Sequence, residues 1–236
     1  MKTSLKDLLL TMGIKLTEEQ VRQFAQYQQE LLAWNQKINL TALTEEREIL
    51  IKHFYDSLLG LKAIKWSGEE RVLDLGTGAG FPGLPLKLVY PSLSVVLADS
   101  LQKRVKFLRH LSGVLGLTGL EIVHGRAEDL GREESYRGKF EVVVSRAVAK
   151  LTVLAEYCLP FVRQEGVFLA YKGGDGAQEY EEASLAIEKL GGKLWKTVAF
   201  SLPEGLGERT IICLKKVKPT PAIFPRKPGI PRKSPL

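Results

Sequence analysis

The first quarter of the chain places its apolar residues at helical spacing. Residues 17–20 read TEEQ, a capping-box sequence that marks the start of a helix. The apolar face that follows comprises Val21, Phe24, Tyr27, Leu31 and Trp34. A second helix, which Thr44 is placed to cap, carries Ile49, Leu50, His53, Phe54 and Leu58. We therefore expect residues 1–66 to form an N-terminal helical cap.

After residue 66 the pattern changes to short apolar runs that alternate with amphipathic segments. The expected strands cover residues 71–75, 94–98, 120–123, 140–144, 166–171, 193–200 and 209–214. The expected helices cover residues 84–90, 102–115, 151–162 and 177–190. This alternation predicts an α/β fold with a doubly wound, mostly parallel sheet. Because no helix separates the last two strands, they are expected to pair antiparallel at the sheet edge, completing a core over residues 67–215.

Positive charge and proline gather at the C-terminal end. The chain has 236 residues, 44% of them hydrophobic, which suits one α/β core rather than two. Its net charge is +7, and the last 22 residues hold seven Lys or Arg, no acid and six of the eleven prolines. A disordered, solubilising end is one interpretation of the tail, which we take as residues 216–236, all but the first of these 22 residues. The apolar Phe224, Ile230 and Leu236 between the charges favour docking, either on the body of the protein or on RNA.

Several other classes of protein find no support in the sequence. No apolar run approaches the ~18 to 20 residues that a membrane span needs, and no His or Cys spacing is typical of a metal site. Cys158 and Cys213 lie in apolar segments and are expected to be buried, reduced thiols. We therefore expect a cytoplasmic protein with no metal and no membrane association.

The most informative stretch is residues 72–83, VLDLGTGAGFPG, in which four glycines follow the first strand. In such sheets ligands bind beyond the carboxyl ends of the strands, and glycine lets the backbone approach them closely. From Gly78 the loop fits the dinucleotide pattern G-x-G-x-x-G, but Gly76 already holds the position that closes the strand. From Asp74 it resembles the first motif of class I S-adenosylmethionine-dependent methyltransferases, (D/E)-x-G-x-G-x-G, whose fold is Rossmann-like. The acid suits a ligand with an ammonium group and would repel a pyrophosphate; a tight turn without a ligand is the third interpretation.

The candidate cofactor contacts of this loop are Asp74, Gly76, Gly78 and Gly80. The next strand ends in Asp99, whose carboxylate is suited to accept both ribose hydroxyls of a nucleoside, and Ser100 and Leu101 follow it. A helix N-cap is the alternative role for Asp99. Ala127 and Glu128 follow the third strand, where class I methyltransferases place the adenine; alone, Glu128 is more often a solvated turn residue.

The end of the fourth strand bears on the methyl acceptor. Residues 144–147 read VSRA, which is neither the (D/N)-P-P-(Y/F) of exocyclic amine methylases nor the Pro-Cys of cytosine C5 methylases. A guanine N7 atom already exposes a lone pair, so its methylation is a direct in-line displacement that needs no general base. Arg146 is suited to donate to guanine O6 or to a neighbouring phosphate, and a structural ion pair is the alternative.

Six stretches together resemble the glucose-inhibited division protein B family, the bacterial small-subunit ribosomal RNA guanine-N7 methyltransferases. They are residues 34–41, 53–58, 73–83, 145–147, 171–173 and 224–231, so the resemblance spans nearly the whole chain. It implies S-adenosylmethionine as cofactor, S-adenosylhomocysteine as product and one guanine of 16S ribosomal RNA as acceptor. The family's cofactor-contact positions fall on Gly76, Phe81, Ala127, Glu128 and Arg146.

Other polar residues are candidates for the RNA side of the site. Arg146 and Lys172 are the expected catalytic residues, and Lys172 is also a candidate phosphate or base contact. The remaining candidate RNA contacts are Asn39, His53, Arg226, Lys227, Arg232 and Lys233. Asn39 has an alternative role as a turn cap, and His53 has one in a local contact with Asp56.

The sequence thus predicts a monomeric enzyme whose partner is small-subunit ribosomal RNA or the assembled small subunit. Two other functions remain open. One is a class I methyltransferase that acts on a small molecule or a protein; a small-molecule enzyme would have no use for the basic tail. The other is a non-catalytic RNA-binding module, which would not bind S-adenosylmethionine.

Overall fold

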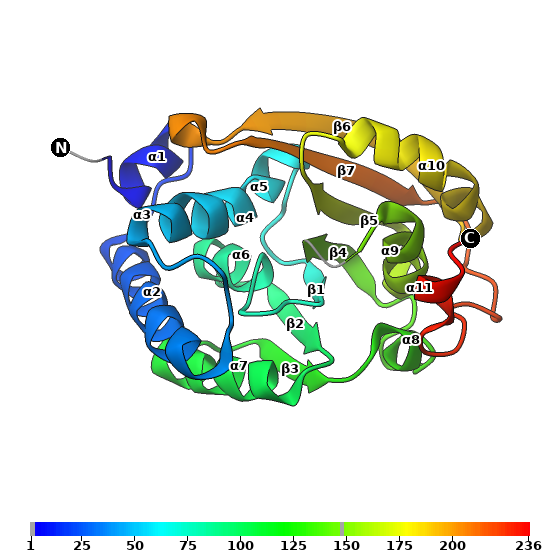
Figure 1. Cartoon of the computed structure of the whole chain (residues 1–236), viewed down its shortest axis with the longest axis horizontal. Coiled ribbons are helices and arrows are strands. Elements are labelled where there is room, and N and C mark those ends of the chain that lie inside the picture. Colours follow the sequence, from blue (N-terminus) through cyan, green and yellow to red (C-terminus); the bar gives the residue numbers. More distant parts are fainter. Residues whose placement is uncertain (1–2, 147–148) are drawn as a thin grey trace.

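The computed structural model describes residues 3–146 and 149–236, and its centre is a seven-stranded sheet of order β3-β2-β1-β4-β5-β7-β6 (Figure 1). The strands are β1 (Arg71–Leu75), β2 (Ser94–Asp99), β3 (Leu120–His124), β4 (Phe140–Arg146), β5 (Val162–Lys172), β6 (Gly192–Ser201) and β7 (Glu208–Lys216). Neighbours from β3 to β5 pair parallel, and β7 pairs antiparallel with both β5 and β6. The predicted α/β fold with an antiparallel hairpin at the edge is confirmed, and β7 lies second from that edge.

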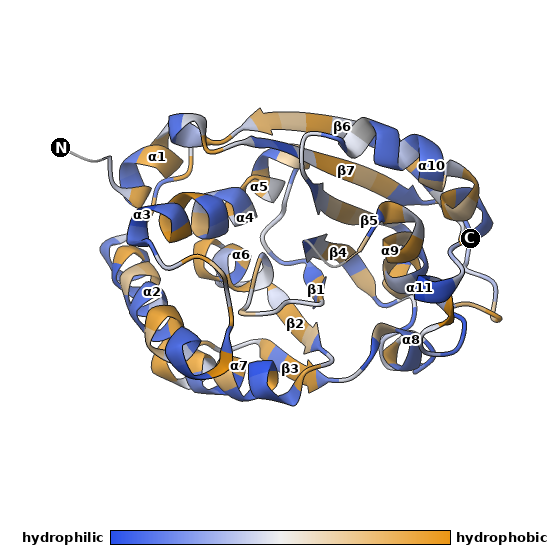
Figure 2. Ribbon diagram, viewed as in Figure 1, coloured by the Kyte–Doolittle hydropathy of each residue, from blue (hydrophilic) through white to orange (hydrophobic). Residues whose placement is uncertain are grey.

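Helices cover both faces of the sheet (Figure 1). In the core these are α6 (Gly83–Val89), α7 (Gln102–Val114), α8 (Ala127–Leu130), α9 (Leu151–Cys158) and α10 (Gly176–Lys189), with 3-10 turns at Leu159–Phe161 and Pro203–Gly205. One hydrophobic cluster joins α6 and α7 to one sheet face, and a second joins α9 and α10 to the other. The apolar residues of the strands accordingly run through the middle of the molecule (Figure 2). The predicted helix 151–162 is too long, because Pro160 lacks the amide that would continue it.

The N-terminal segment forms the expected helical cap. Its helices are α1 (Leu5–Thr11), α2 (Glu18–Ile38), α3 (Glu46–Ile49), the π-helix η1 (Leu50–Tyr55), α4 (Asp56–Leu58) and α5 (Gly60–Ala63). The predicted capping box of α2 is confirmed, since Thr17 and Gln20 exchange hydrogen bonds of 2.8 and 3.2 Å. The predicted cap at Thr44 is wrong: α3 begins after Glu45 and has no side-chain cap.

The cap and the sheet share one hydrophobic core. The cap side chains Phe24, Tyr27 and Phe54 belong to the same buried cluster as Val72 of β1 and Leu84 of α6. A long apolar helix face therefore packs on the sheet rather than on a second domain. No helix within residues 3–146 and 149–236 has the length and apolar character needed to cross a membrane.

The tail is docked on the body of the protein, one of the two positions expected from its sequence. It leaves β7, crosses beside α8 and α9, and ends in the short helix α11 (Ile230–Lys233), drawn in red in Figure 1. Phe224 is 2% exposed and belongs to the cluster that includes α9 and α10. Cys158 and Cys213 are buried, unpaired thiols, as predicted.

The amine of Lys216 joins the tail to the core. It is 2% exposed, and it donates to the carbonyls of Leu159 at 2.8 Å and Leu190 at 3.0 Å and to the Thr220 hydroxyl. Burial lowers its pKa to about 7.

Replacing Lys216 by methionine is expected to lower the free energy of unfolding by about 1–3 kcal/mol. Methionine fills a similar volume but cannot donate, so the hydrogen bonds that join this side chain to the core and to Thr220 are lost. Urea unfolding measures the change, and Lys218→Met, at an exposed tail position, is the matched control. Equal stability of the two variants would show that these hydrogen bonds contribute nothing net.

Candidate functional site

A cavity of about 390 Å³ lies at the carboxyl ends of the central strands, and we call it the strand-end cavity. Six of the predicted cofactor contacts line it: Gly76, Asp99, Ser100, Leu101, Ala127 and Glu128. They come from the ends of β1, β2 and β3, which the parallel register brings to one edge of the sheet. Ala149, Tyr157, Gly229 and Arg232 also line it, and sequence reasoning missed their place there.

Asp74 lies beneath the glycine loop rather than in the wall of this cavity. Its Oδ2 accepts hydrogen bonds from the Thr77 hydroxyl at 2.6 Å and from the Gly83 amide at 2.7 Å. The side chain is fully buried, its Oδ1 has no partner, and burial raises the pKa of the carboxyl to about 7. Asp74 therefore holds both ends of the loop. Its direct contact with a ligand stays a prediction.

Replacing Asp74 by asparagine is expected to remove a pH dependence of stability. The folded-state pKa of about 7 exceeds the ordinary 3.8, so the carboxyl stabilises the fold most below pH 3.8 and loses that contribution as pH rises through 7. Asparagine stays neutral and still accepts from Thr77 and Gly83. Urea unfolding between pH 5 and 9 should find Asp74→Asn at least as stable as the wild type at the upper limit.

The control is Asp74→Ala, which leaves the buried Gly83 amide without an acceptor. We expect it to be about 1–3 kcal/mol less stable than Asp74→Asn at every pH. If the difference in stability between Asp74→Asn and the wild type is the same at pH 5 and at pH 9, the carboxyl does not titrate near pH 7 and our assignment is wrong.

Asp99 connects the end of β2 to the glycine loop. Its Oδ2 accepts from the Gly78 amide at 2.9 Å and lies 3.3 Å from the Arg104 guanidinium, and its Oδ1 accepts from the Leu101 amide at 2.9 Å. The side chain is 1% exposed. The carboxylate thus fixes the loop and the start of α7 together. Its predicted contact with ribose hydroxyls stays a prediction.

Gly78 and Gly80 determine the backbone path of the glycine loop, and Phe81 packs the loop against the cap. Gly78 and Gly80 have φ of +63° and +104°, which are left-handed values that favour glycine. The Phe81 ring lies between two rings of the cap, 5.3 Å from Tyr27 and 4.5 Å from His53 between centroids. Phe81 is 5% exposed and packs against the cap rather than lining the strand-end cavity.

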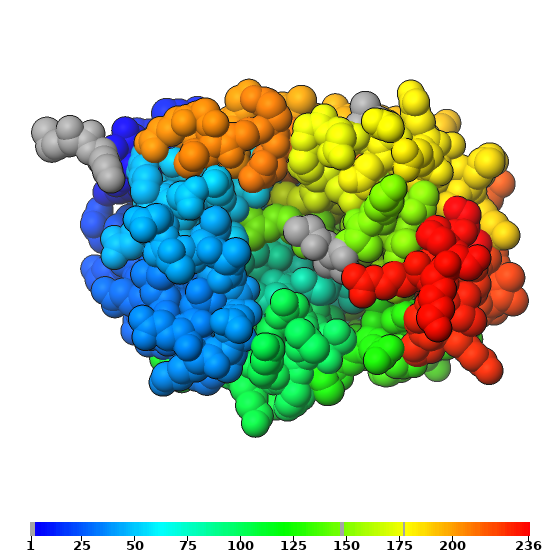
Figure 3. Space-filling view, viewed as in Figure 1, coloured from blue at the N-terminus to red at the C-terminus, as the bar shows by residue number. Residues whose placement is uncertain are grey.

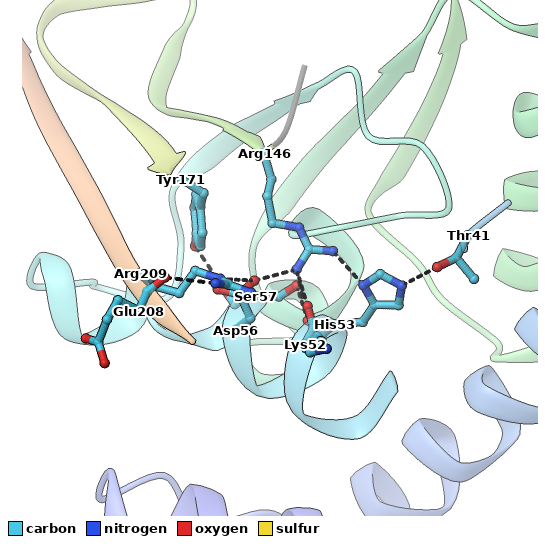
Figure 4. Close-up of polar contacts among 9 residues, drawn as sticks. All are labelled: Thr41, Lys52, His53, Asp56, Ser57, Arg146, Tyr171, Glu208 and Arg209. Carbon is cyan, nitrogen blue, oxygen red and sulfur yellow. Dashed lines mark hydrogen bonds and ion pairs between the residues drawn. The ribbon is translucent and has the colours of Figure 1, made fainter. Parts of the chain in front are cut away.

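A second cavity, of about 460 Å³, lies between the cap and the core, and we call it the cap–core cavity. Arg146, at the end of β4, crosses from the sheet to the cap, where its Nη1 donates to the carbonyls of Lys52 at 3.1 Å and His53 at 3.3 Å (Figure 4). The same nitrogen lies 3.2 Å from Asp56 Oδ2, which also pairs with Arg209 Nε at 3.1 Å. Arg146 therefore ties β4 to η1 and α4. Ala147, the last residue of the SRA motif, lies outside the described residues.

His53 is held in one tautomer by its neighbours. Arg146 Nη2 lies 3.1 Å from His53 Nδ1, and because a guanidinium only donates, Nδ1 accepts (Figure 4). His53 Nε2 then carries the proton and donates to Thr41 Oγ1 at 2.7 Å. Burial and the charge of Arg146 lower the pKa of the ring to about 3, so it is neutral at physiological pH. The sequence left open a direct contact between His53 and Asp56. In the structure Arg146 binds both of these side chains and connects them.

Lys172 also lines the cap–core cavity, and its amine has two partners. Its amine lies 2.7 Å from Glu179 Oε2 and donates to the Ala149 carbonyl at 2.6 Å. Ala149 in turn lines the strand-end cavity. Ala149 therefore connects the two cavities: it lines the strand-end cavity, and its carbonyl is bound by Lys172 of the cap–core cavity.

The predicted RNA contacts lie in four different places. Asn39 is the exposed C-cap of α2 with φ +50°, which is the turn role that its sequence context offered. His53 and Lys172 face the cap–core cavity, and Arg226 is bound to Glu156. The tail residues Lys227, Arg232 and Lys233 are exposed. Their contacts with RNA stay predictions. Within residues 3–146 and 149–236, no group of three or more His, Cys, Asp or Glu is placed to hold a metal ion.

Comparison with known proteins adds to this geometry. A sequence model of the GidB family, described as rRNA small subunit methyltransferase G, matches residues 20–211. The ribosomal RNA small subunit methyltransferase G of Lachnoclostridium phytofermentans is 50% identical over 228 residues, covering 97% of this chain and 94% of the relative. That of Brevibacillus brevis is 46% identical over 235 residues, covering 100% and 99%.

Solved structures with low identity share the fold. M. jannaschii TYW2 in complex with AdoMet has a TM-score of 0.54 at 16% identity, over 69% of this chain and 77% of that chain. TrmN from Thermus thermophilus has a TM-score of 0.53 at 18% identity, over 71% and 53%. These likenesses confirm the predicted class I methyltransferase fold.

Proposed function

The chain belongs to the GidB family of small-subunit ribosomal RNA methyltransferases, and on that basis we propose that it transfers the methyl group of S-adenosylmethionine to N7 of a guanine in that RNA. The observation that carries the proposal is the pair of adjoining cavities. The strand-end cavity is lined by six of the predicted cofactor contacts, and the cap–core cavity by Arg146, His53 and Lys172. Donor and acceptor would then meet beside the carboxyl end of β4.

Methyl transfer to N7 depends more on how the protein aligns the two reactants than on proton transfer. The guanine N7 lone pair attacks the methyl carbon, the S–CH₃ bond breaks as the N7–CH₃ bond forms, and the positive charge passes from sulfur to the purine. Holding the two reactants in line can lower the barrier by roughly 7–11 kcal/mol. His53 has both ring nitrogens engaged and is neutral, so it is suited to support Arg146 rather than to remove a proton.

Arg146 is the residue best placed to orient the acceptor. Its guanidinium lies 5.0 Å from the centroid of the Phe81 ring and reaches four acceptors on the cap. While N7 is the nucleophile it accepts no hydrogen bond, so we assign guanine O6 or the adjacent phosphate as the partner of this arginine. Lys172 supports the same edge through the Ala149 carbonyl.

The test is transfer of labelled methyl from S-adenosylmethionine to unmethylated small subunits, and separately to naked small-subunit RNA. Mass spectrometry of nuclease fragments then maps the modified nucleotide. We expect one guanine labelled at N7, with binding that weakens steeply as salt rises. Label on a different base atom, on a protein or on a small molecule would establish another acceptor. If calorimetry detects no binding of S-adenosylmethionine, that result would favour an RNA-binding module.

A further inference from the structure

The tail is fixed beside the strand-end cavity by a buried ion pair. Glu156 of α9 has a side chain that is 1% exposed, and Arg226 meets it with Nε at 3.0 Å and Nη2 at 2.6 Å. The backbone amide of Arg226 also donates to Glu156, at 2.7 Å. A carboxylate so far removed from water is stable only when it is paired in this way. The position of Arg226 is therefore determined by the core and not by a partner molecule.

Two arginines of the core hold the tail backbone on the other side. Arg137 donates to the carbonyl of Phe224 at 2.7 Å and to that of Thr220 at 2.8 Å. Arg132 donates to the carbonyl of Pro225 at 2.6 Å. Because proline-rich segments lack amides for a ladder, these donors satisfy carbonyls that would otherwise face only water. The tail is thus an ordered part of the protein before any RNA is bound.

Beyond Arg226 the tail enters the wall of the strand-end cavity. The Gly229 amide donates to Glu128 Oε1 at 3.0 Å, and Gly229 and Arg232 line the cavity together with Ala127 and Tyr157. Glu128 is 6% exposed. Burial of the Tyr157 hydroxyl, together with the neighbouring Glu128 carboxylate, raises the pKa of that hydroxyl. Figure 3 shows the red tail packed against the green segment at the hollow on this face.

We propose that residues 226–232 are a wall of the cofactor site, with Arg226 as a positioning residue and Arg232 as a contact to the adenosine half of S-adenosylmethionine. This rests on the proposed function, because it assigns the strand-end cavity to that cofactor. Ala127 and Glu128 mark the part of the cavity where the adenine is expected. A planar guanidinium stacks on an aromatic ring or donates to its nitrogens, so Arg232 matches a purine there.

The proposal gives Glu128 and the basic tail different roles from those expected of them. Besides marking the part of the cavity expected to hold the adenine, the Glu128 carboxylate binds the Gly229 amide of the tail and so holds the wall. Part of the tail's positive charge serves cofactor binding, while exposed residues such as Lys227 and Lys233 remain available to RNA. A change at Arg226 should therefore weaken cofactor binding even when no RNA is present.

The experiment measures the affinity of the full-length protein for S-adenosylhomocysteine by calorimetry, without RNA. Arg232→Ala is expected to weaken binding about fivefold, the effect of losing one cation–aromatic contact. Arg226→Ala is expected to weaken it about tenfold, because apparent affinity falls with the fraction of molecules that keep the wall in place. Arg226→Lys should recover only part of the loss, since lysine cannot form the bidentate pair. Lys218→Ala, an exposed change in the same tail, is the matched control and should bind as the wild type does.

The outcomes separate this proposal from the proposed function. If the wild type binds no S-adenosylhomocysteine, the cofactor assignment fails. If the wild type binds S-adenosylhomocysteine, and Arg232→Ala and Arg226→Ala bind it as tightly as the wild type does, the cofactor assignment stands. Only the proposal that the tail is a wall of the site is then wrong, and the tail serves RNA alone. Thermal unfolding of each variant identifies loss of fold. Arg232 is exposed, so Arg232→Ala tests the contact even if Arg226→Ala is unstable.

Discussion

Replacing Arg146 by alanine is expected to lower the rate of methyl transfer to RNA by about 100-fold or more, while the sheet stays folded. The side chain joins β4 to the carbonyls of Lys52 and His53 and to Asp56, so its loss removes these hydrogen bonds between the cap and the edge of the site. It also removes the group that holds His53 Nδ1 and the donor proposed for guanine O6. Misplacing reactants by about 1 Å is enough for an effect of this size.

Single-turnover transfer to small-subunit RNA measures this change, with calorimetry of cofactor binding and thermal unfolding alongside it. Arg209→Ala is the matched control, because it removes the other cation beside Asp56 and leaves Arg146 in place. We expect a smaller loss of rate there, and only partial recovery in Arg146→Lys, which keeps the charge without the planar fork. Turnover at the wild-type rate in Arg146→Ala would remove this residue from the site.

Replacing Gly80 by alanine is expected to lower the free energy of unfolding by about 3 kcal/mol and to abolish cofactor binding. Its φ of +104° is strained for any residue with a Cβ, and that atom would lie 2.5 Å from the Tyr27 hydroxyl. Tyr27 is fully buried and donates to the Ala79 carbonyl at 2.6 Å, so it has little room to move. The glycine loop would have to change its path.

The comparison that isolates the steric effect is Gly116→Ala. Gly116 has a φ of +62° with nothing within 4 Å of an added Cβ, and it lies outside both cavities. It should cost only the backbone strain, about 1–2 kcal/mol, and leave cofactor affinity unchanged. Urea unfolding and calorimetry distinguish the two variants. Equal losses in both would mean that strain alone, and not the contact with Tyr27, determines the effect.

The parts of the site that were predictable are those that lie at the ends of strands. Gly76, Asp99 and Ala127 each follow a short apolar run, and parallel strands bring their carboxyl ends to one edge. The sequence did not predict that Asp74 and Phe81 lie behind the loop, because a motif records spacing and not direction. Nor did it predict the ion pairs of Asp56 with Arg146 and Arg209, which join segments far apart in the chain.

By itself the sequence determined the succession of strands and helices along the chain, the glycine loop and the basic end. These features follow from periodicity, turn chemistry and charge, which are local properties. Only the tertiary structure decided what those parts contact. It placed the proline-rich tail on Glu156 and Glu128 rather than in solvent, and it placed His53 against Arg146 in a neutral form. The physical reason is that a buried charge needs a partner, and which partner is within reach depends on how distant segments pack.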